Sequence, residues 1–174
     1  ARGVSSAISW FFEQEEAGVI IEDDCVPVPG FFRYCEELLS RYADDESVMH
    51  ISGNSRARLQ DPGTTYFFSR YPQVWGWATW RRSWERFSFE QHEPEPEMKK
   101  VLSRFSSTRE RQLWETQLQG TFDGEIDSWA YRWAYALWLN DGVSAYPSMN
   151  MVDNVGFGSD STHTRSWSLS RLTM

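Results

Sequence analysis

The segment that decides the fold is GVIIEDDCVPVPGFF, residues 18–32. Its apolar run VII, residues 19–21, predicts a short strand of the kind found in parallel sheets that are covered on both faces. Three carboxylates, Glu22, Asp23 and Asp24, follow this run directly. In open α/β sheets, ligands bind in the crevice beyond the carboxyl ends of the strands. We therefore expect these acids to lie where a ligand binds.

The three adjacent acids create an electrostatic conflict that a cation would remove. Like charges at one strand end repel each other, and burying them without a partner is costly. Oxygen ligands of this kind suit Mg²⁺ or Mn²⁺. The alternative is a solvated acidic turn that leads into the next helix and helps to cap it.

Length and composition indicate one globular domain, because 174 residues are enough to bury a core. The chain has 17 Lys and Arg against 25 Asp and Glu, and this negative charge argues against nucleic acid as a partner. Aromatic residues make up 16% of the chain, with ten Trp, and they serve either a large core or sugar binding. Two cysteines, Cys25 and Cys35, define no disulfide framework, so we expect a reduced, cytoplasmic setting. No apolar run approaches the ~20 residues of a membrane span.

Helical and strand patterns alternate along the first part of the chain. A helix is predicted over residues 5–17 with Gly18 past its end, and Pro27 and Pro29 make the segment after the acids a loop. The further expected elements are a helix at 31–42, a strand at 48–52, a polar loop at 55–65, a strand at 66–69, an exposed charged segment at 90–100, one or two helices within 98–119, a helix at 128–140, a strand at 143–147 and a loop at 150–164. This order predicts an α/β sheet with parallel members.

The motif WGWATW, residues 75–80, surrounds one glycine with tryptophans. Gly76 allows a positive φ or a close backbone approach. Trp75, Trp77 and Trp80 either pack in the core or line a pocket, and their position around Gly76 favours the pocket.

Asp127 and the histidines are the remaining candidates for chemistry. Asp127 precedes the predicted helix at 128–140, where an Asp is commonly an N-cap but can also present its carboxylate to a cleft. His163 follows a glycine-bearing loop and is either a metal ligand or a surface residue. His50 lies within a strand pattern and is expected in the core, whereas His92 lies in the charged segment and is expected in solvent.

Taken in order, these pieces resemble the GT-A glycosyltransferase core. Glu22–Asp23–Asp24 resembles its DxD-type acidic motif, Gly76 its glycine loop, Asp127 in EIDSW its acidic element before a helix, and His163 in THT its late metal-binding histidine. The segment EDDCVPVPGFFRYCEELL is similar to N-acetylglucosaminyltransferase I-like enzymes. With HISGN, WGWATWRRSW and NVGFG, the string from residue 1 to about 164 is similar to bacterial family-2 nucleotide-diphospho-sugar transferases.

The resemblance implies a Rossmann-like mixed sheet flanked by helices, and a metal-dependent transfer of a sugar from a nucleotide-diphosphate donor to a glycan or other hydroxyl acceptor. It assigns the divalent cation, Mn²⁺ or Mg²⁺, to Asp24 and His163, and donor contacts to Glu22, Asp23, Gly76 and Trp77. It makes Asp127 the base that takes the acceptor proton. An inverting enzyme needs only this one base, because a single displacement forms no covalent intermediate.

Two departures from the family pattern leave alternatives open. Many relatives carry an acid directly after the tryptophan that matches Trp129, where this chain has Ala130, so that either Asp127 is the base or the base is absent. A GT-A fold also opens with β-α-β elements that hold the nucleoside, and this chain is expected to lack most of them, to form a single partial domain and to transfer no sugar alone. The alternatives are a non-catalytic carbohydrate-binding or scaffold domain of the same fold, and a metal-dependent hydrolase that uses the same acids.

Overall fold

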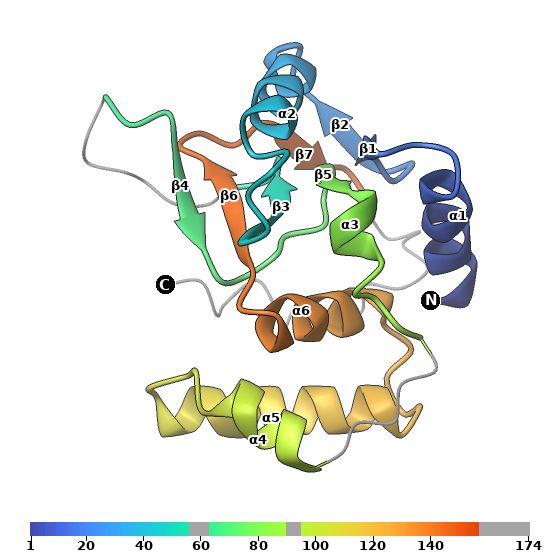
Figure 1. The fold of residues 1–174 in the computed structure, drawn as a ribbon, viewed down its shortest axis with the longest axis vertical. Coiled ribbons are helices and arrows are strands. Elements are labelled where there is room, and N and C mark those ends of the chain that lie inside the picture. The colour runs from blue at the N-terminus through green and yellow to red at the C-terminus, as the bar shows by residue number, and fades with distance from the viewer. Residues whose placement is uncertain (56–62, 90–94, 157–174) are drawn as a thin grey trace.

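The fold is described by a computed structural model of residues 1–55, 63–89 and 95–156 (Figure 1). Its main sheet has the strand order β1-β5-β3-β6-β4. Among these strands β3 and β6 run parallel, and the other neighbouring pairs run antiparallel. The strands of the main sheet are β1 (Ala17–Ile20), β3 (Val48–Ser52), β4 (Tyr66–Ser69), β5 (Trp77–Trp80) and β6 (Val143–Pro147). Two short strands, β2 (Cys25–Pro27) and β7 (Val152–Asn154), pair antiparallel beside it.

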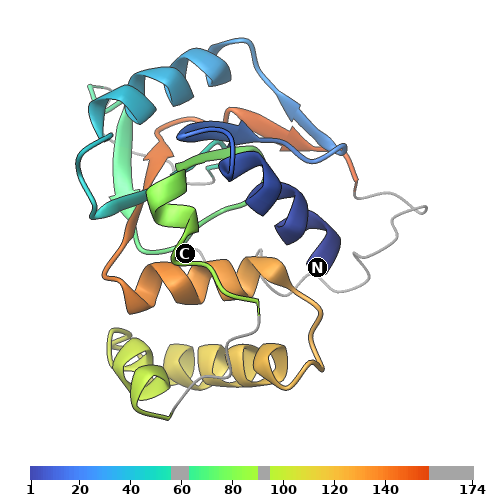
Figure 2. The same ribbon diagram turned by 45° about the vertical axis from the view of Figure 1, so that its right-hand side comes forward.

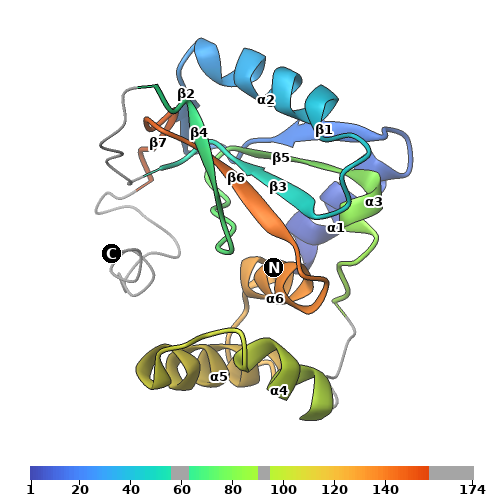
Figure 3. The ribbon, with the colours of Figure 1, turned by 60° about the vertical axis from the view of Figure 1, so that its left-hand side comes forward.

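The helices form layers on both faces of the sheet. Helix α2 (Gly30–Arg41) covers one face, while α1 (Arg2–Phe12), α3 (Arg81–Trp84) and α6 (Trp129–Leu139) lie on the other (Figure 2). Helices α4 (Glu95–Leu102) and α5 (Thr108–Phe122) pack against the outer side of α6, away from the sheet (Figure 3). Buried apolar side chains form one cluster between α2 and the sheet and a second between the sheet and helices α1, α3 and α6. A third cluster fills the interface between α6 and the outer helices α4 and α5.

Strand β3 serves the cores on both faces because successive side chains of a strand point to opposite sides, and its register with β6 shifts between Val48 and His50. Val48 packs in the cluster under α2, and Met49 packs in the cluster under α6. The irregularity lets the next residue, His50, face α6 as well, where it stacks on Trp77 with ring centroids 4.9 Å apart.

Several sequence predictions are confirmed. The strands at 48–52, 66–69 and 143–147 have the expected bounds, and the helices at 31–42 and 128–140 are α2 and α6 within a residue. The segment 98–119 forms parts of two helices, α4 and α5. The mixed α/β architecture with flanking helices is as expected. Both cysteines are buried and unpaired.

The prediction of a buried, parallel VII strand is wrong. Strand β1 is the outermost strand of the described sheet, it pairs antiparallel with β5, and its residues are half-buried. Ile21 lies beyond β1 and is 38% exposed. An apolar run indicates burial but does not encode strand direction, and antiparallel pairing with β5 leaves the other edge of β1 unpaired in the described chain.

Helix α1 is shorter and earlier than predicted. It ends at Phe12, so Gly18 is not its C-terminal glycine but a residue of β1 that pairs with Thr79. A Cβ on Gly18 would lie 2.4 Å from the ring of Phe11, so the glycine is needed because the ring of α1 lies directly against the strand. Ser5, the expected first residue of the helix, lies inside α1, and its Oγ donates to the carbonyl of Arg2.

Among the described residues, the sequence patterns missed three strands, the short helix α3 and the start of α4. Pro27 is the last residue of β2, where its missing N–H does not prevent pairing with β7. Part of WGWATW forms β5, and part of the loop predicted at 150–164 forms β7. The described part of the charged segment belongs to α4, which has Glu95 and Glu97 in its first turn.

In the described parts of the chain, the helices are all too short or too polar to cross a bilayer.

Candidate functional site

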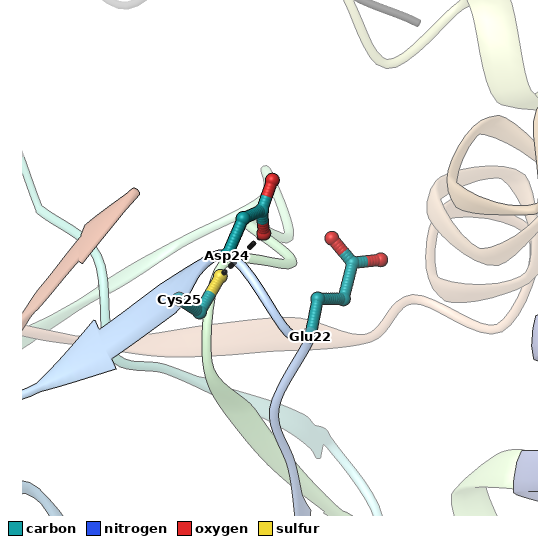
Figure 4. A group of neighbouring side chains, drawn as sticks. All are labelled: Glu22, Asp24 and Cys25. Carbon is teal, nitrogen blue, oxygen red and sulfur yellow. Dashed lines mark hydrogen bonds between the residues drawn. The ribbon is translucent and has the colours of Figure 1, made fainter. Parts of the chain in front are cut away.

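A tight turn brings two carboxylates and a thiol together just beyond β1. The N–H of Cys25 donates to the carbonyl of Glu22 at 3.0 Å, so residues 22–25 reverse the chain between β1 and β2. The potential ligand atoms of Glu22, Asp24 and Cys25 all lie within 4.8 Å of one another. Figure 4 shows the two carboxylates projecting to the same side of this turn. We call this group the acidic turn.

The electrostatics of the acidic turn favour a positive partner. Burial raises the pKa of Glu22, and the nearby charges of Asp24 and Asp23 raise it further. Burial also raises the pKa of the Cys25 thiol to about 12, with the carboxylates of Asp24 and Glu22 adding to the effect. The thiol therefore stays protonated at neutral pH, and its Sγ donates to Oδ1 of Asp24 at 3.6 Å. A cation here would meet two carboxylate ligands and a neutral sulfur.

The short sheet β2–β7 fixes Asp24 from the other side. The carbonyl of Asp24 accepts from the N–H of Val155 at 2.8 Å. Gly156 follows, and its own N–H donates to Oδ1 of Asn154 at 2.8 Å. A Cβ on Gly156 would lie 2.2 Å from Oδ2 of Asp24. The position of the Asp24 carboxylate therefore depends on a glycine that is 132 residues away in the sequence.

Gly76 reaches the same neighbourhood through β7. It is buried with φ +58°, and a Cβ there would lie 2.7 Å from Cγ2 of Val152. Its carbonyl accepts from the N–H of Gly53 at 2.8 Å. The expected positive φ and close approach at Gly76 are thus confirmed, and the close neighbour is strand β7, which pairs with β2.

Trp77 does not have the surface that a donor contact needs. Its side chain is 0% exposed and stacks between His50 and Trp129, with centroids 4.9 and 5.7 Å away. Trp80 is also buried, on the α2 side of the sheet, whereas Trp75 is half-buried. Of the three tryptophans, Trp75 alone retains a partly accessible side chain, because β5 turns the other two into the cores on either face.

Asp127 lies against the start of α1 rather than capping α6. Ser128 is the N-cap, and its Oγ accepts from the N–H of Tyr131 at 3.3 Å, so the N-cap interpretation of Asp127 is wrong. The Asp127 side chain is 77% exposed, and its Oδ2 accepts from the nitrogen of Ala1 at 3.0 Å. It lines an open cavity of about 410 Å³ that also includes Phe89 and Arg132.

The structure therefore joins part of the predicted site. It brings Glu22 and Asp24 together and connects them through β7 to Gly76, whereas Asp23 is exposed and stands outside the three-residue group. His163 and His92 lie outside the described residues. Cys25 is a member that sequence reasoning missed, and its place directly after the three acids was the available signal.

His50 is the core histidine that the strand pattern predicted. It is 0% exposed, and burial lowers its pKa to about 3. Its Nδ1 accepts from Nε1 of Trp133 at 3.1 Å, so the proton is on Nε2, which donates to the carbonyl of Gln73 at 2.9 Å. The neutral ring thereby ties the segment before Trp75 to the core.

Comparison with known proteins adds no family to these observations: no protein-family model matches the chain, and no curated protein is significantly similar to it.

Proposed function

We propose that this chain carries the metal-binding part of a glycosyltransferase that moves a sugar from a nucleotide diphosphate to an acceptor hydroxyl. The observation that carries the proposal is the acidic turn, in which Glu22 and Asp24 converge at the end of β1. The order of motifs that resembles the GT-A core supports the same function. So does the link between the acidic turn and Gly76 through β7.

The donor set of the acidic turn fits a hard divalent cation. Two carboxylates on one side of a turn offer the oxygen ligands that Mn²⁺ and Mg²⁺ prefer. The raised pKa of Glu22 reflects burial near like charges, and a cation would reverse the effect of those charges. In such enzymes the bound cation neutralises the diphosphate leaving group.

The residues of this chain then have separate tasks. Asp24 and Glu22 hold the cation, together with His163 as the resemblance implies. Cys25 remains a neutral thiol and orients the Asp24 carboxylate by its hydrogen bond. Asp23, whose side chain is exposed between Glu22 and Asp24, contacts the donor, and Gly76 lets the chain pass close to β7. Asp127 accepts the proton of the attacking hydroxyl in a single, inverting displacement.

The first test measures Mn²⁺ binding by calorimetry and uses the neighbouring acid as a matched control. Asp24→Asn removes one ligand charge, so we expect the affinity to fall by more than roughly 100-fold, since even residues behind a ligand are worth about 10–100-fold. Asp23→Asn makes the same chemical change outside the three-residue group and should leave the affinity within a few-fold of the starting protein. Equal affinities for the two variants would rule out the acidic turn as the metal site.

The second test concerns the reaction itself. A panel of sugar nucleotides is offered with acceptors to the full-length gene product, and the products are identified by mass spectrometry. Transfer to an acceptor that needs Mn²⁺ supports the proposal. Release of free sugar from the donor without acceptor indicates the hydrolase instead, and carbohydrate binding without turnover indicates the non-catalytic alternative.

A further inference from the structure

A second, smaller pocket lies between helices α5 and α6 and the segment before Gly76. Its volume is about 130 Å³, and aromatic side chains dominate its lining: Tyr71, Trp75, Trp114, Tyr131 and Trp138. The remaining wall includes Ala130, whose small side chain leaves space at the first turn of α6. The pocket is separate from the acidic turn and from the cavity at Asp127.

The walls of this aromatic pocket are held in place from behind. Trp114 packs edge-on against Trp138 with centroids 4.6 Å apart, and against Tyr131 at 6.1 Å. Nε1 of Trp138 donates to the carbonyl of Arg70 at 2.7 Å, and the hydroxyl of Tyr146 donates to the carbonyl of Tyr71 at 2.6 Å. Because rings and backbone are both anchored, the pocket is preformed and does not need to open for a ligand.

Size and chemistry select the ligand. An apolar protein cavity of about 150 Å³ takes a benzene molecule, so this pocket matches a single ring. A sugar ring carries hydroxyls around its whole rim, whereas Gln73 and the two tyrosines are the polar side chains in the lining. A fully inserted sugar would therefore bury several hydroxyls without partners, which costs more than the contact of its C–H faces with the aromatic rings returns. Aromatic walls instead favour a flat ring that can lie against one wall and meet the next edge-on.

We propose that the aromatic pocket binds one planar aromatic ring of phenol size, and that this ring belongs to the acceptor. The second part rests on the proposed function. It follows from chain adjacency, because Trp75 directly precedes Gly76 and Ala130 lies three residues after Asp127. An acceptor whose ring occupies the pocket is thereby held beside both segments.

The binding test uses 4-fluorophenol, followed by ¹⁹F NMR in the presence of EDTA so that no metal or donor is involved. We expect saturable binding, with contacts from the ring protons to tryptophan protons in nuclear Overhauser spectra. Ala130→Leu fills the pocket and should weaken binding by at least about tenfold, since one methylene too many in an apolar pocket already changes affinity by 10–200-fold. Ala134→Leu, a second lining position, should do the same.

The control is Ala7→Leu, which makes the same change on an exposed position of α1 and should leave the affinity unchanged. Loss of binding in all three variants, no binding in the starting protein, or tighter binding of methyl glucoside than of 4-fluorophenol would each overturn the pocket assignment. The Mn²⁺ titration is independent of this result, so the two proposals fail separately.

The acceptor role has its own readout in the full-length gene product. Ala130→Leu should raise KM for a phenol-bearing acceptor at least about tenfold while leaving KM for the sugar nucleotide unchanged. Active transfer with the same acceptor KM in both proteins would contradict the acceptor role and leave the glycosyltransferase proposal intact.

Discussion

Two residues without charged side chains, Cys25 and Gly156, set the geometry of the acidic turn. Glu22 and Asp24 converge because the Cys25 N–H closes a turn on the Glu22 carbonyl. Asp24 then keeps its carboxylate orientation because Gly156 leaves room for Oδ2. The Cys25 N–H and Gly156 both lie outside the two acidic side chains. A substitution at Gly156 can therefore test the geometry of the acidic turn without removing a carboxylate.

Gly156→Ala should disturb the Asp24 carboxylate while leaving the ligands in place. The new methyl group would occupy a point 2.2 Å from Oδ2, and the carboxylate is the softer of the two groups and must move. We expect roughly 10–100-fold weaker Mn²⁺ binding, the range for groups that orient a ligand, with thermal unfolding nearly unchanged. Mn²⁺ affinity equal to that of the starting protein would show that the orientation of Asp24 is unimportant for binding.

Asp127→Asn and Ser128→Ala separate catalysis from capping at adjacent residues. Loss of a general base lowers kcat by roughly 10²–10⁴-fold, so Asp127→Asn should do so in the full-length gene product without loss of stability. Ser128→Ala removes the cap of α6 and should cost about 1 kcal/mol in the free energy of unfolding. If Asp127→Asn turned over normally, Asp127 would not be the base.

At the residue scale, the sequence indicated which residues have special roles but not which residues they contact. The three acids, the glycine with positive φ and the buried histidine were all recognisable from local patterns. The role of Gly156 was not, because it depends on the β2–β7 pairing of residues more than 120 positions apart. Trp77 was placed wrongly because a strand starting at residue 77 directs it into the core.

At the scale of elements, helix α1 and strand β1 are joined by a contact that depends on a glycine. The ring of Phe11 lies where the side chain of residue 18 would be. Local helix signals could not reveal this, because Gly18 after an amphipathic run is also typical of a helix end. Strand direction could not be predicted either, because the apolar runs of β1 and β3 look alike in the sequence. In the structure β1 pairs antiparallel with β5, whereas β3 pairs parallel with β6.

Gly18→Ala should therefore destabilise the protein, whereas Gly3→Ala should not. The first change forces the Phe11 ring away from β1 and should cost about 1–3 kcal/mol, as overpacking usually does. A Cβ on Gly3, inside α1, meets nothing within 4 Å and should add up to about 1 kcal/mol of helix stability. Urea unfolding of the two variants checks this, and equal effects would contradict the contact.

At the scale of the whole molecule, His50 couples the folded state to pH. The ring is neutral in the folded protein because its pKa is lowered to about 3, whereas an unfolded histidine has a pKa of about 6.5. Between these values the unfolded chain binds more protons. The contribution of His50 is thus complete above about pH 6.5 and is lost as the pH falls towards 3.

We expect His50 alone to remove about 2 kcal/mol from the free energy of unfolding between pH 7.5 and 5. Urea titrations of the starting protein and of His50→Asn at both pH values measure this. Carboxylates contribute equally to both proteins, so the difference in pH dependence isolates the histidine. Parallel pH profiles would mean that His50 is not buried as a neutral ring.

The outer pair of helices has a consequence for how such a molecule could diversify. Residues 95–122 form one contiguous stretch that packs on α6 rather than on the sheet, and it supplies Trp114 to the aromatic pocket. The acidic turn lies between β1 and β2 and contains no residue of that stretch. Exchanging that stretch for another helical hairpin would reshape the pocket and leave Glu22, Asp24 and Cys25 untouched. The proposed acceptor selectivity and the proposed metal chemistry could therefore evolve at different rates in this fold.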